Sequence, residues 1–174
     1  MGQNPNSDPF PTMSTHTLAE PEAQNLTGKY LTFRIGEESF GVDVLKIREI
    51  IRMQKITPVP QMPTHVRGVI NLRGKVIPVF DLRAKFNLPP GEADSRNCIV
   101  VVQAQSAATT VIVGLIVDAV EEVINIQQNQ CEPAPDMGGG LNNGYVLCLA
   151  KIKSEVKTLL AIDKVILDTG MGGF

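Results

Sequence analysis

One pattern of residue types occurs twice in this chain, at an offset of 73 residues. The first copy runs from Gly41 to Ile51, and the second runs from Gly114 to Ile124. Each copy has a glycine, two apolar positions, a short turn, a glutamate and a second apolar pair. Repetition of this kind is typical of a structural unit that is used twice. The sequence therefore predicts two similar lobes.

A shorter match supports the same interpretation. Val79–Leu82 and Ala161–Lys164 both place an aspartate directly after the end of an apolar run. We assign the first lobe mainly to residues 29–90 and the second mainly to residues 97–165.

Apolar runs of strand length fill both predicted lobes. Hydrophobic residues make up 43% of the chain and aromatic residues only 5%, so the core must be largely aliphatic. Val and Ile are frequent in these runs, and β-branched side chains favour strands. Because antiparallel strands of this length usually close into barrels, we predict an all-β protein, mainly strands with short helices. The predicted strands are 29–35, 39–42, 66–72, 75–80, 97–104, 110–117, 144–152 and 156–162.

Aspartates that follow the apolar runs predict the starts of four short helices, because an aspartate side chain suits the N-cap position. Capping explains these carboxylates better than a role as general acids does. The predicted helices are Asp43–Arg48, Asp81–Phe86, Asp118–Glu121 and Asp163–Leu167.

Both ends of the chain lack the apolar periodicity of the middle. Residues 1–25 are rich in Pro, Asn, Ser and Thr and are predicted to be a disordered tail. Residues 169–174 are Gly-rich and are predicted to be a flexible tail. The folded domain is therefore expected to span residues 26–168.

Catalytic and metal-binding patterns are missing from the sequence. His16 lies in the predicted tail, and His65 stands apart from any nucleophile or paired carboxylate. Nucleophile-elbow, zinc-protease, P-loop and dinucleotide-binding motifs do not occur. The Glu121-Glu122 pair lacks a third ligand nearby and is predicted to be solvated. We predict a protein without enzymatic activity, metal or cofactor.

The three cysteines and the charge restrict the class further. Cys98, Cys131 and Cys148 have no CxxC spacing, which argues against a zinc site or a disulfide framework. The net charge of −2 and the absence of Lys or Arg runs argue against a nucleic-acid partner. No apolar run approaches the roughly 20 residues that cross a bilayer, and the N-terminus has no apolar signal core. We expect a cytoplasmic protein with no direct membrane insertion.

Three segments carry more specific information: Phe40–Ile50 (FGVDVLKIREI), Val66–Arg83 (VRGVINLRGKVIPVFDLR) and Val113–Val123 (VGLIVDAVEEV). Together with the Pro133-Ala134-Pro135 loop, they resemble the CheW-type chemotaxis coupling proteins. The resemblance covers residues 29–168, and the string in the middle segment is the most specific part of it.

The resemblance implies a fold of two SH3-like five-stranded β-barrel lobes packed side by side, which agrees with the repeat. It also implies a non-catalytic adaptor without a cofactor. Members of this family bind the cytoplasmic tip of a chemoreceptor and the regulatory domain of the histidine kinase CheA, which has the same fold. The expected function is therefore to couple transmembrane chemoreceptors to CheA, in the cytoplasm, at membrane-associated receptor arrays.

The resemblance further implies a receptor-binding set that lines a groove between the lobes. Glu49 and Arg73 are its central pair, because the matching family residues face one another near this groove. Strand stability does not require an arginine at a hairpin tip, which also favours a binding role. The other members could instead be plain core positions, and Gly114 could mark a strand bulge. The full set is Ile47, Glu49, Arg73, Ile99, Gly114, Val120 and Val123.

A kinase-binding set is implied at two other places. Gly68 and Gly74 flank the hairpin that resembles the first-lobe contact, and Glu132 and Met137 match a second-lobe contact. Some family members carry a basic and an aromatic residue at this second contact. Glu132 reverses the charge there, so either this contact is lost or the charge of its partner has changed too.

Three alternatives remain open at this point. A relative within the same family could serve a pilus, gliding or developmental pathway. A small-molecule-binding or hydrolytic barrel would require a pocket with convergent polar groups and perturbed acids. An oligonucleotide-binding barrel would require stacking aromatic residues with basic partners.

Overall fold

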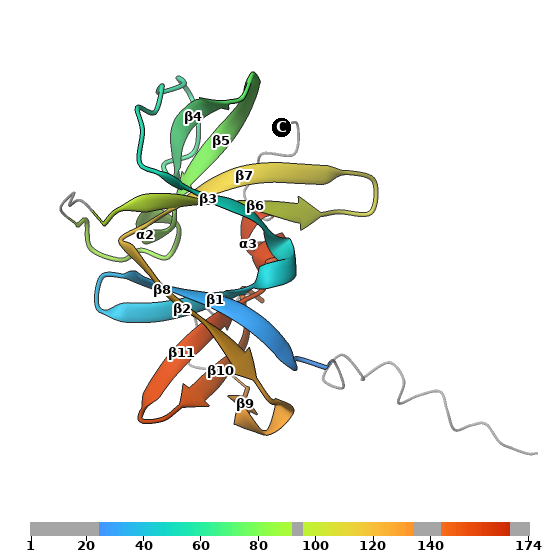
Figure 1. Ribbon diagram of the computed structural model, residues 1–174. Coiled ribbons are helices and arrows are strands. Elements are labelled where there is room, and N and C mark those ends of the chain that lie inside the picture. Colours follow the sequence, from blue (N-terminus) through green and yellow to red (C-terminus); the bar gives the residue numbers. More distant parts are fainter. Residues whose placement is uncertain (1–24, 92–95, 134–143, 168–174) are drawn as a thin grey trace, which may run out of the picture.

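The computed structural model of the protein describes residues 25–91, 96–133 and 144–167. These residues form two β-sheets, one above the other in Figure 1, with short helices between them. Apart from Asn25, both predicted tails lie outside the described residues. Within the described ranges, every helix is too short or too polar to cross a membrane.

The two sheets have six and five strands. The six-stranded sheet contains β1 (Gly28–Ile35), β2 (Glu38–Asp43), β8 (Ala119–Ile126), β9 (Cys131–Glu132), β10 (Val146–Ile152) and β11 (Glu155–Leu160), in the order β8-β1-β2-β11-β10-β9. The five-stranded sheet contains β3 (Ile47–Arg52), β4 (Val66–Leu72), β5 (Lys75–Asp81), β6 (Cys98–Gln105) and β7 (Thr110–Val117), in the order β3-β6-β7-β5-β4. Both are SH3-like lobes, and among the described residues no ladder pairs the end strands of either sheet into a closed barrel.

The division of the chain between the lobes differs from the prediction. The five-stranded sheet is built from the continuous segment 47–117, which we call the inserted lobe. The six-stranded sheet is built from residues 28–43 and 119–160, which we call the split lobe. The predicted lobes of residues 29–90 and 97–165 are therefore wrong, because β3 pairs with β6 and β8 pairs with β1.

The two copies of the sequence repeat are the two crossings between the lobes. In the first copy, β2 ends in the split lobe at Asp43, and β3 begins in the inserted lobe after the short helix η3 (Val44–Lys46). In the second copy, β7 ends in the inserted lobe, and β8 begins in the split lobe just after Asp118. β3, an edge strand of the inserted lobe, therefore follows the β1–β2 hairpin of the split lobe. In the same way β8, an edge strand of the split lobe, follows the β6–β7 hairpin of the inserted lobe. The repeat indicated the structural unit correctly but not which sheet each strand joins.

Two of the four predicted helix starts are confirmed. The Asp43 carboxylate accepts a hydrogen bond of 2.9 Å from the Leu45 N–H, at η3. The Asp81 carboxylate accepts one of 3.0 Å from the Arg83 N–H, at α2 (Leu82–Lys85). The remaining described helices are η4 (Gln128–Gln130) and α3 (Ile162–Leu167).

The other two predicted starts are corrected. The segment predicted as helix 118–121 is a bend that leads into β8, and the Asp118 carboxylate accepts hydrogen bonds from the Gly36 N–H and from Arg83 instead. Asp163 lies inside the first turn of α3 rather than at its cap. The carboxylate of an aspartate that follows a strand can accept a hydrogen bond from any donor nearby. An aspartate at this position therefore does not by itself predict the start of a helix.

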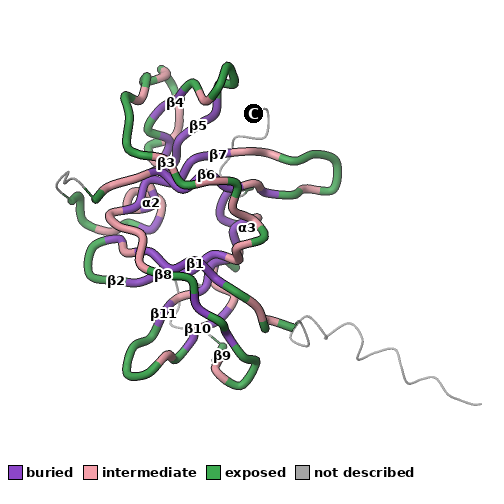
Figure 2. Tube along the Cα trace, in the orientation of Figure 1, coloured by how far each residue is buried: buried purple, intermediate pink, exposed green. Residues whose placement is uncertain are grey.

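Buried side chains form three clusters, and the largest lies between the lobes (Figure 2). Leu31, Phe33 and Ile35 of β1 belong to this inter-lobe core, whereas Tyr30 points the other way into the split lobe. Successive strand residues face opposite sides, so β1 is buried on both faces. The inter-lobe core also contains Phe40, Val42, Val66, Phe80, Leu82, Phe86, Val100, Val102, Ala104, Val113, Leu115, Val117, Tyr145, Leu160, Ile162, Val165 and Ile166.

Gly68 on β4 provides a test of this architecture. Its neighbour Val69 exchanges two backbone hydrogen bonds of 2.9 Å with Thr57. A methyl group at Gly68 would lie 2.2 Å from the Thr57 carbonyl oxygen. We expect Gly68→Ala to lower the free energy of unfolding by about 1–3 kcal/mol, because backbone must move. Urea denaturation measures this change.

Gly28→Ala is the matched control. Gly28 has φ 157°, close to the 151° of Gly68, but nothing lies within 4 Å of its added methyl group. Its loss of stability should therefore be smaller. Equal losses for the two variants would show that backbone conformation, and not the contact with Thr57, makes Gly68 necessary.

Candidate protein-binding site

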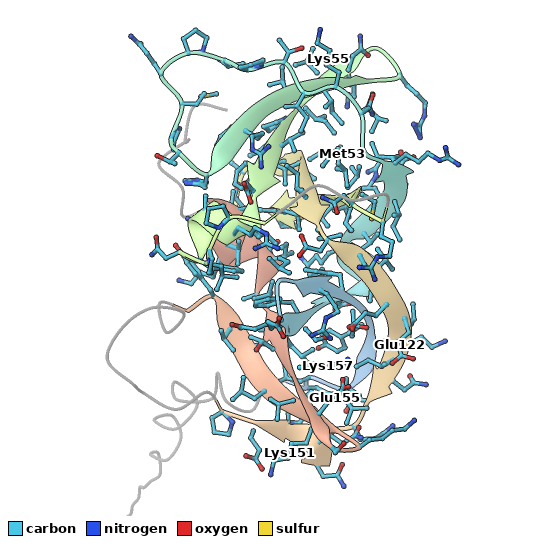
Figure 3. All side chains as sticks on the ribbon, turned by 90° about the vertical axis from the view of Figure 1, so that its left-hand side faces the viewer. Met53, Lys55, Glu122, Lys151, Glu155 and Lys157 are labelled. Carbon is cyan, nitrogen blue, oxygen red and sulfur yellow. The ribbon has the colours of Figure 1, made fainter. Side chains whose placement is uncertain are left out.

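The two edge strands β3 and β8, one from each lobe, lie on the same face of the protein. Figures 1 and 3 both show them there, one above the other. They are the equivalent strands of the repeat, and each begins one of the sheets. Ile50 on β3 is 45% exposed, and Val123 on β8 is 54% exposed. We call the surface formed by Ile47, Ile50, Val120 and Val123 the β3–β8 face. Glu49 precedes Ile50 on β3 and points to the other side of the strand, beside this face.

Ile47 and Val120 connect this face to the interior. Both residues are half-buried and pack against the inter-lobe core from equivalent positions of the two crossings. The β3–β8 face therefore has apolar side chains at its base and at its rim. Apolar residues on edge strands are a site at which another chain can bind, and proteins usually avoid them.

Glu49 and Arg73 form the predicted pair. Nη2 of Arg73 donates a hydrogen bond of 2.5 Å to Oε2 of Glu49. Arg73 lies in the β4–β5 turn with φ 51°, followed by Gly74 with φ 87°, which is the left-handed conformation that tight hairpins need. The pair joins the two ends of the five-stranded sheet, because β3 is its first strand and β4 its last.

The setting of this ion pair favours recognition over stability. The Arg73 side chain is 66% exposed, and an exposed pair contributes only about 0.2–1 kcal/mol. A pocket of about 180 Å³ lies beside it, and its lining includes Arg48, Leu72 and Lys75. Glu49 thus holds the Arg73 guanidinium in place beside this pocket, where a partner can reach it.

The prediction that Ile99 and Gly114 contact the receptor directly is wrong, because both residues are buried. Ile99 is completely buried inside the inserted lobe. Gly114 is buried too, and a methyl group there would lie 2.7 Å from Cγ2 of Ile99. Gly114 therefore makes room for the Ile99 side chain and not for the backbone of a partner.

The four predicted kinase contacts have different surroundings. Gly74 is exposed at the hairpin tip, where its N–H donates a hydrogen bond of 2.8 Å to Asn71. Glu132 is exposed on β9 and pairs with Lys151 at 2.8 Å. Gly68 is buried beneath Thr57, so the prediction that it contacts the kinase directly is wrong. Met137 lies outside the described residues.

Several exposed apolar residues were missed by the sequence interpretation. Ile50 is one, although the repeat aligns it with Val123, which was predicted. Leu45 in η3 is 80% exposed. Val76 and Val156 are also exposed, each at the same position after a hairpin turn, one in each lobe. Treating equivalent positions of the repeat as equivalent sites would have found Ile50.

A buried polar network distinguishes the split lobe from the inserted lobe. Lys157 on β11 has a side chain only 4% exposed, and its ammonium group lies 3.3 Å from Glu121, 3.1 Å from Glu155 and 3.1 Å from Ser39. Figure 3 labels Lys157 and Glu155 in the lower lobe. Glu121 also accepts hydrogen bonds from Ser39 at 2.6 Å and Arg34 at 3.1 Å. Only Glu122 of the predicted solvated pair is exposed.

These partners determine the ionisation of Glu121. Burial alone would raise the pKa of its carboxyl group, but the hydrogen bonds from Ser39 and Arg34 and the charge of Lys157 outweigh burial. The pKa therefore lies below its ordinary value. A lowered pKa in the folded state stabilises the protein above the unfolded pKa of about 4.3. This stabilisation disappears as the pH falls through the lower, folded pKa.

We expect Glu121→Gln to weaken the acid dependence of stability. In the original protein, the free energy of unfolding should fall as the pH drops below about 4.3, the unfolded pKa. In the variant, stability should be lower at pH 7 and should change less over the same acid range. Urea denaturation from pH 3 to 7 measures both effects. Glu122→Gln, at the exposed neighbour, should leave the profile unchanged, and an equal effect of both variants would contradict the network.

The fold and the exposed surfaces together define the class of this protein. This is a protein of two SH3-like lobes with a common core and apolar edge strands on its surface. Among the described residues, no group of three or more His, Cys, Asp or Glu could hold a metal ion. Its exposed apolar edge strands are surfaces at which another chain can bind.

Comparison with known proteins identifies the family. The model of the CheW-like domain matches residues 29–169, so the chain belongs to the CheW-like family. A chemotaxis protein CheW from Rhizobium meliloti (strain 1021) is 32% identical over 82% of this chain and 92% of the relative. A chemotaxis protein CheW from Bacillus subtilis (strain 168) is 35% identical over 77% of this chain and 81% of the relative.

A solved structure agrees with this assignment. The crystal structure of the scaffolding protein TtCheW from Thermoanaerobacter tengcongensis is similar to this chain with a TM-score of 0.71 and 31% sequence identity. The similarity covers 80% of this chain and 92% of that chain. The prediction of the family and of its two-lobed β fold is confirmed.

Proposed function

We propose that this chain is a chemotaxis scaffold that couples transmembrane chemoreceptors to the histidine kinase CheA. The match to the CheW-like domain over residues 29–169 is the observation that carries the proposal. The relatives described above are named as chemotaxis proteins, which favours chemotaxis over a pilus, gliding or developmental pathway. The chain catalyses no reaction of its own and is recruited to membrane-associated receptor arrays.

The β3–β8 face is the proposed receptor site. The receptor tip is a helical hairpin, and an amphipathic helix binds best to an apolar surface with a few polar groups that fix its register. Ile50 and Val123 supply exposed apolar area, and Ile47 and Val120 lie at its base. The Glu49–Arg73 pair supplies the polar group, since the exposed guanidinium has donors left for a receptor carboxylate or carbonyl.

The kinase regulatory domain is proposed to bind at two separate places. One is the β4–β5 turn of the inserted lobe, where Gly74 exposes its backbone. The other is the edge of the split lobe at β9, where Glu132 is exposed. Two unlike surfaces on one module permit contacts to two different neighbours, as a ring requires. Receptor and kinase then bind to the same rigid scaffold. If the scaffold binds the active and the inactive kinase with different affinity, its binding changes the activity of the kinase.

Charge reversal at Arg73 tests the receptor site. We expect Arg73→Glu to weaken binding to receptor-bearing membranes at least about thirtyfold, because the loss of a hydrogen-bonded interface charge costs about 2 kcal/mol or more. Co-sedimentation measures binding to the membranes, and pull-down of purified CheA measures binding to the kinase. Because Arg73 and Gly74 share the β4–β5 turn, kinase binding should fall less than receptor binding, since the second proposed kinase contact at β9 is unchanged. Receptor-dependent autophosphorylation should fall with the loss of receptor binding.

Lys153→Glu is the matched control. Lys153 occupies the corresponding turn of the split lobe, with φ 60°, and carries the same charge. It should bind receptors within about twofold of the original protein, a difference of less than 0.5 kcal/mol. Normal receptor binding by Arg73→Glu would refute the role of Arg73. Failure of the unaltered protein to bind either partner would refute the coupling function itself.

A further inference from the structure

Two of the three cysteines lie next to each other in the fold. Cys131 on β9 pairs directly with Ala150 on β10. Cys148 precedes Ala150 by two residues on the same strand, so its side chain points to the same side of the sheet. Diagonal neighbours across two antiparallel strands lie about 7–8 Å apart, and a hydrogen bond between the Cys148 and Cys131 thiols shows that these two short side chains meet. Register therefore places the two thiols together, although 17 positions separate them in the sequence.

Packing confirms this placement. Both residues belong to the cluster of apolar side chains inside the split lobe, together with Tyr30, Ile126 and Leu159. Cys148 is only 2% exposed, and Cys131 is half-buried at the margin of the cluster. Burial and a hydrogen bond with the Cys131 thiol raise the pKa of Cys148 above its ordinary value.

The third cysteine has different surroundings. Cys98 begins β6 in the other lobe and packs against the inter-lobe core. It therefore serves as an internal comparison: a thiol of similar exposure to Cys131 but in the other lobe. The sequence spacing argued against a zinc site or a disulfide framework, whereas the structure brings Cys131 and Cys148 into contact and leaves Cys98 apart.

We propose that Cys131 and Cys148 are a redox modification site, at which mild oxidation by a peroxide forms an intramolecular disulfide. The accessible Cys131 reacts first: its thiolate attacks hydrogen peroxide, forming a sulfenic acid and releasing hydroxide, which takes up the thiol proton as water. The Cys148 sulfur then attacks the sulfenic sulfur and loses its proton, and a second water leaves. Two thiols and one hydrogen peroxide thus give one disulfide and two waters.

The order of these steps follows from the two environments. A thiolate is the reactive species, and burial keeps Cys148 protonated, so Cys148 is slow to react with an external oxidant. Its contact with Cys131 makes the second step intramolecular, which compensates for the small thiolate fraction. Cys148 is therefore the resolving thiol, and reduction by a dithiol restores both groups.

The disulfide would fix a weakly held edge strand. β9 has two residues, and among the described residues the pairs Leu149–Glu132 and Ala150–Cys131 join it to β10. A covalent link would tie β9 to β10 at this end of the sheet. Because β9 also carries Glu132, oxidation would hold the second proposed kinase contact in one position. This last consequence depends on the proposed function, whereas the thiol chemistry does not.

The test uses the full chain, reduced and then treated with a small excess of hydrogen peroxide. Peptide mapping under non-reducing conditions should show the Cys131 and Cys148 peptides linked, and thiol titration in denaturant should fall from three thiols to one. Cys98→Ser should form the same link and fall from two thiols to none. Cys148→Ser should form no link, and its Cys131 should be oxidised further. The oxidised protein should melt at a higher temperature than the reduced protein, and dithiothreitol should reverse this shift.

Three results would overturn the proposal. They are sulfinic acid on Cys131 while Cys148 stays a free thiol, disulfides only between chains, and oxidation confined to Cys98. Pull-down of CheA with the oxidised and reduced chain tests the functional consequence separately. Equal kinase binding by both forms, with the disulfide present, would remove the link to Glu132 and leave the modification site standing.

Discussion

The packing of the two lobes against each other is the interaction on which the rest of the structure depends. Phe33 and Phe40 of the split lobe and Leu115 of the inserted lobe are completely buried in this inter-lobe core. β1 of the split lobe and β6 and β7 of the inserted lobe are buried on both faces. Neither sheet could therefore expose its inner face to water without a large loss of hydrophobic stabilisation. The crossings at Asp43 and Asp118 reinforce this packing, because each lobe takes an edge strand from the segment that follows the other.

This exchange of strands also explains the position of the candidate site. Because the crossings are equivalent, they deliver β3 and β8 to the same face, with Ile50 and Val123 exposed at matching positions. A partner that lies along this face would contact both lobes at once. Of the two surfaces proposed for the kinase, the β4–β5 turn adjoins Arg73, and β9 lies at the opposite edge of the split lobe from β8. A scaffold of this kind therefore sets the mutual geometry of its partners through surfaces of one rigid unit.

Much of the fold follows from local sequence signals, and the errors share one cause. The hairpin at Arg73-Gly74, the caps at Asp43 and Asp81 and the contact between Glu49 and Arg73 are local or family features, and all are present. Strand periodicity does not state which sheet a strand joins, so the lobes were divided wrongly. A family resemblance likewise does not state whether a matched residue is exposed, because exposure depends on the packing of distant strands, so Ile99 was placed in the groove. The partners of Glu121 and the contact between two cysteines depend on register between distant strands, which one sequence does not reveal.

Native-state hydrogen exchange on Leu115→Ala is the most direct test of the shared core. Leu115 belongs to the inserted lobe, and its truncation should cost about 2–5 kcal/mol. If the inter-lobe core makes the lobes one cooperative unit, amide protection should fall by the same amount in β1 and β2 of the split lobe as in β6 and β7 of the inserted lobe. Loss of protection confined to the inserted lobe would contradict the account, because the two lobes would then unfold independently.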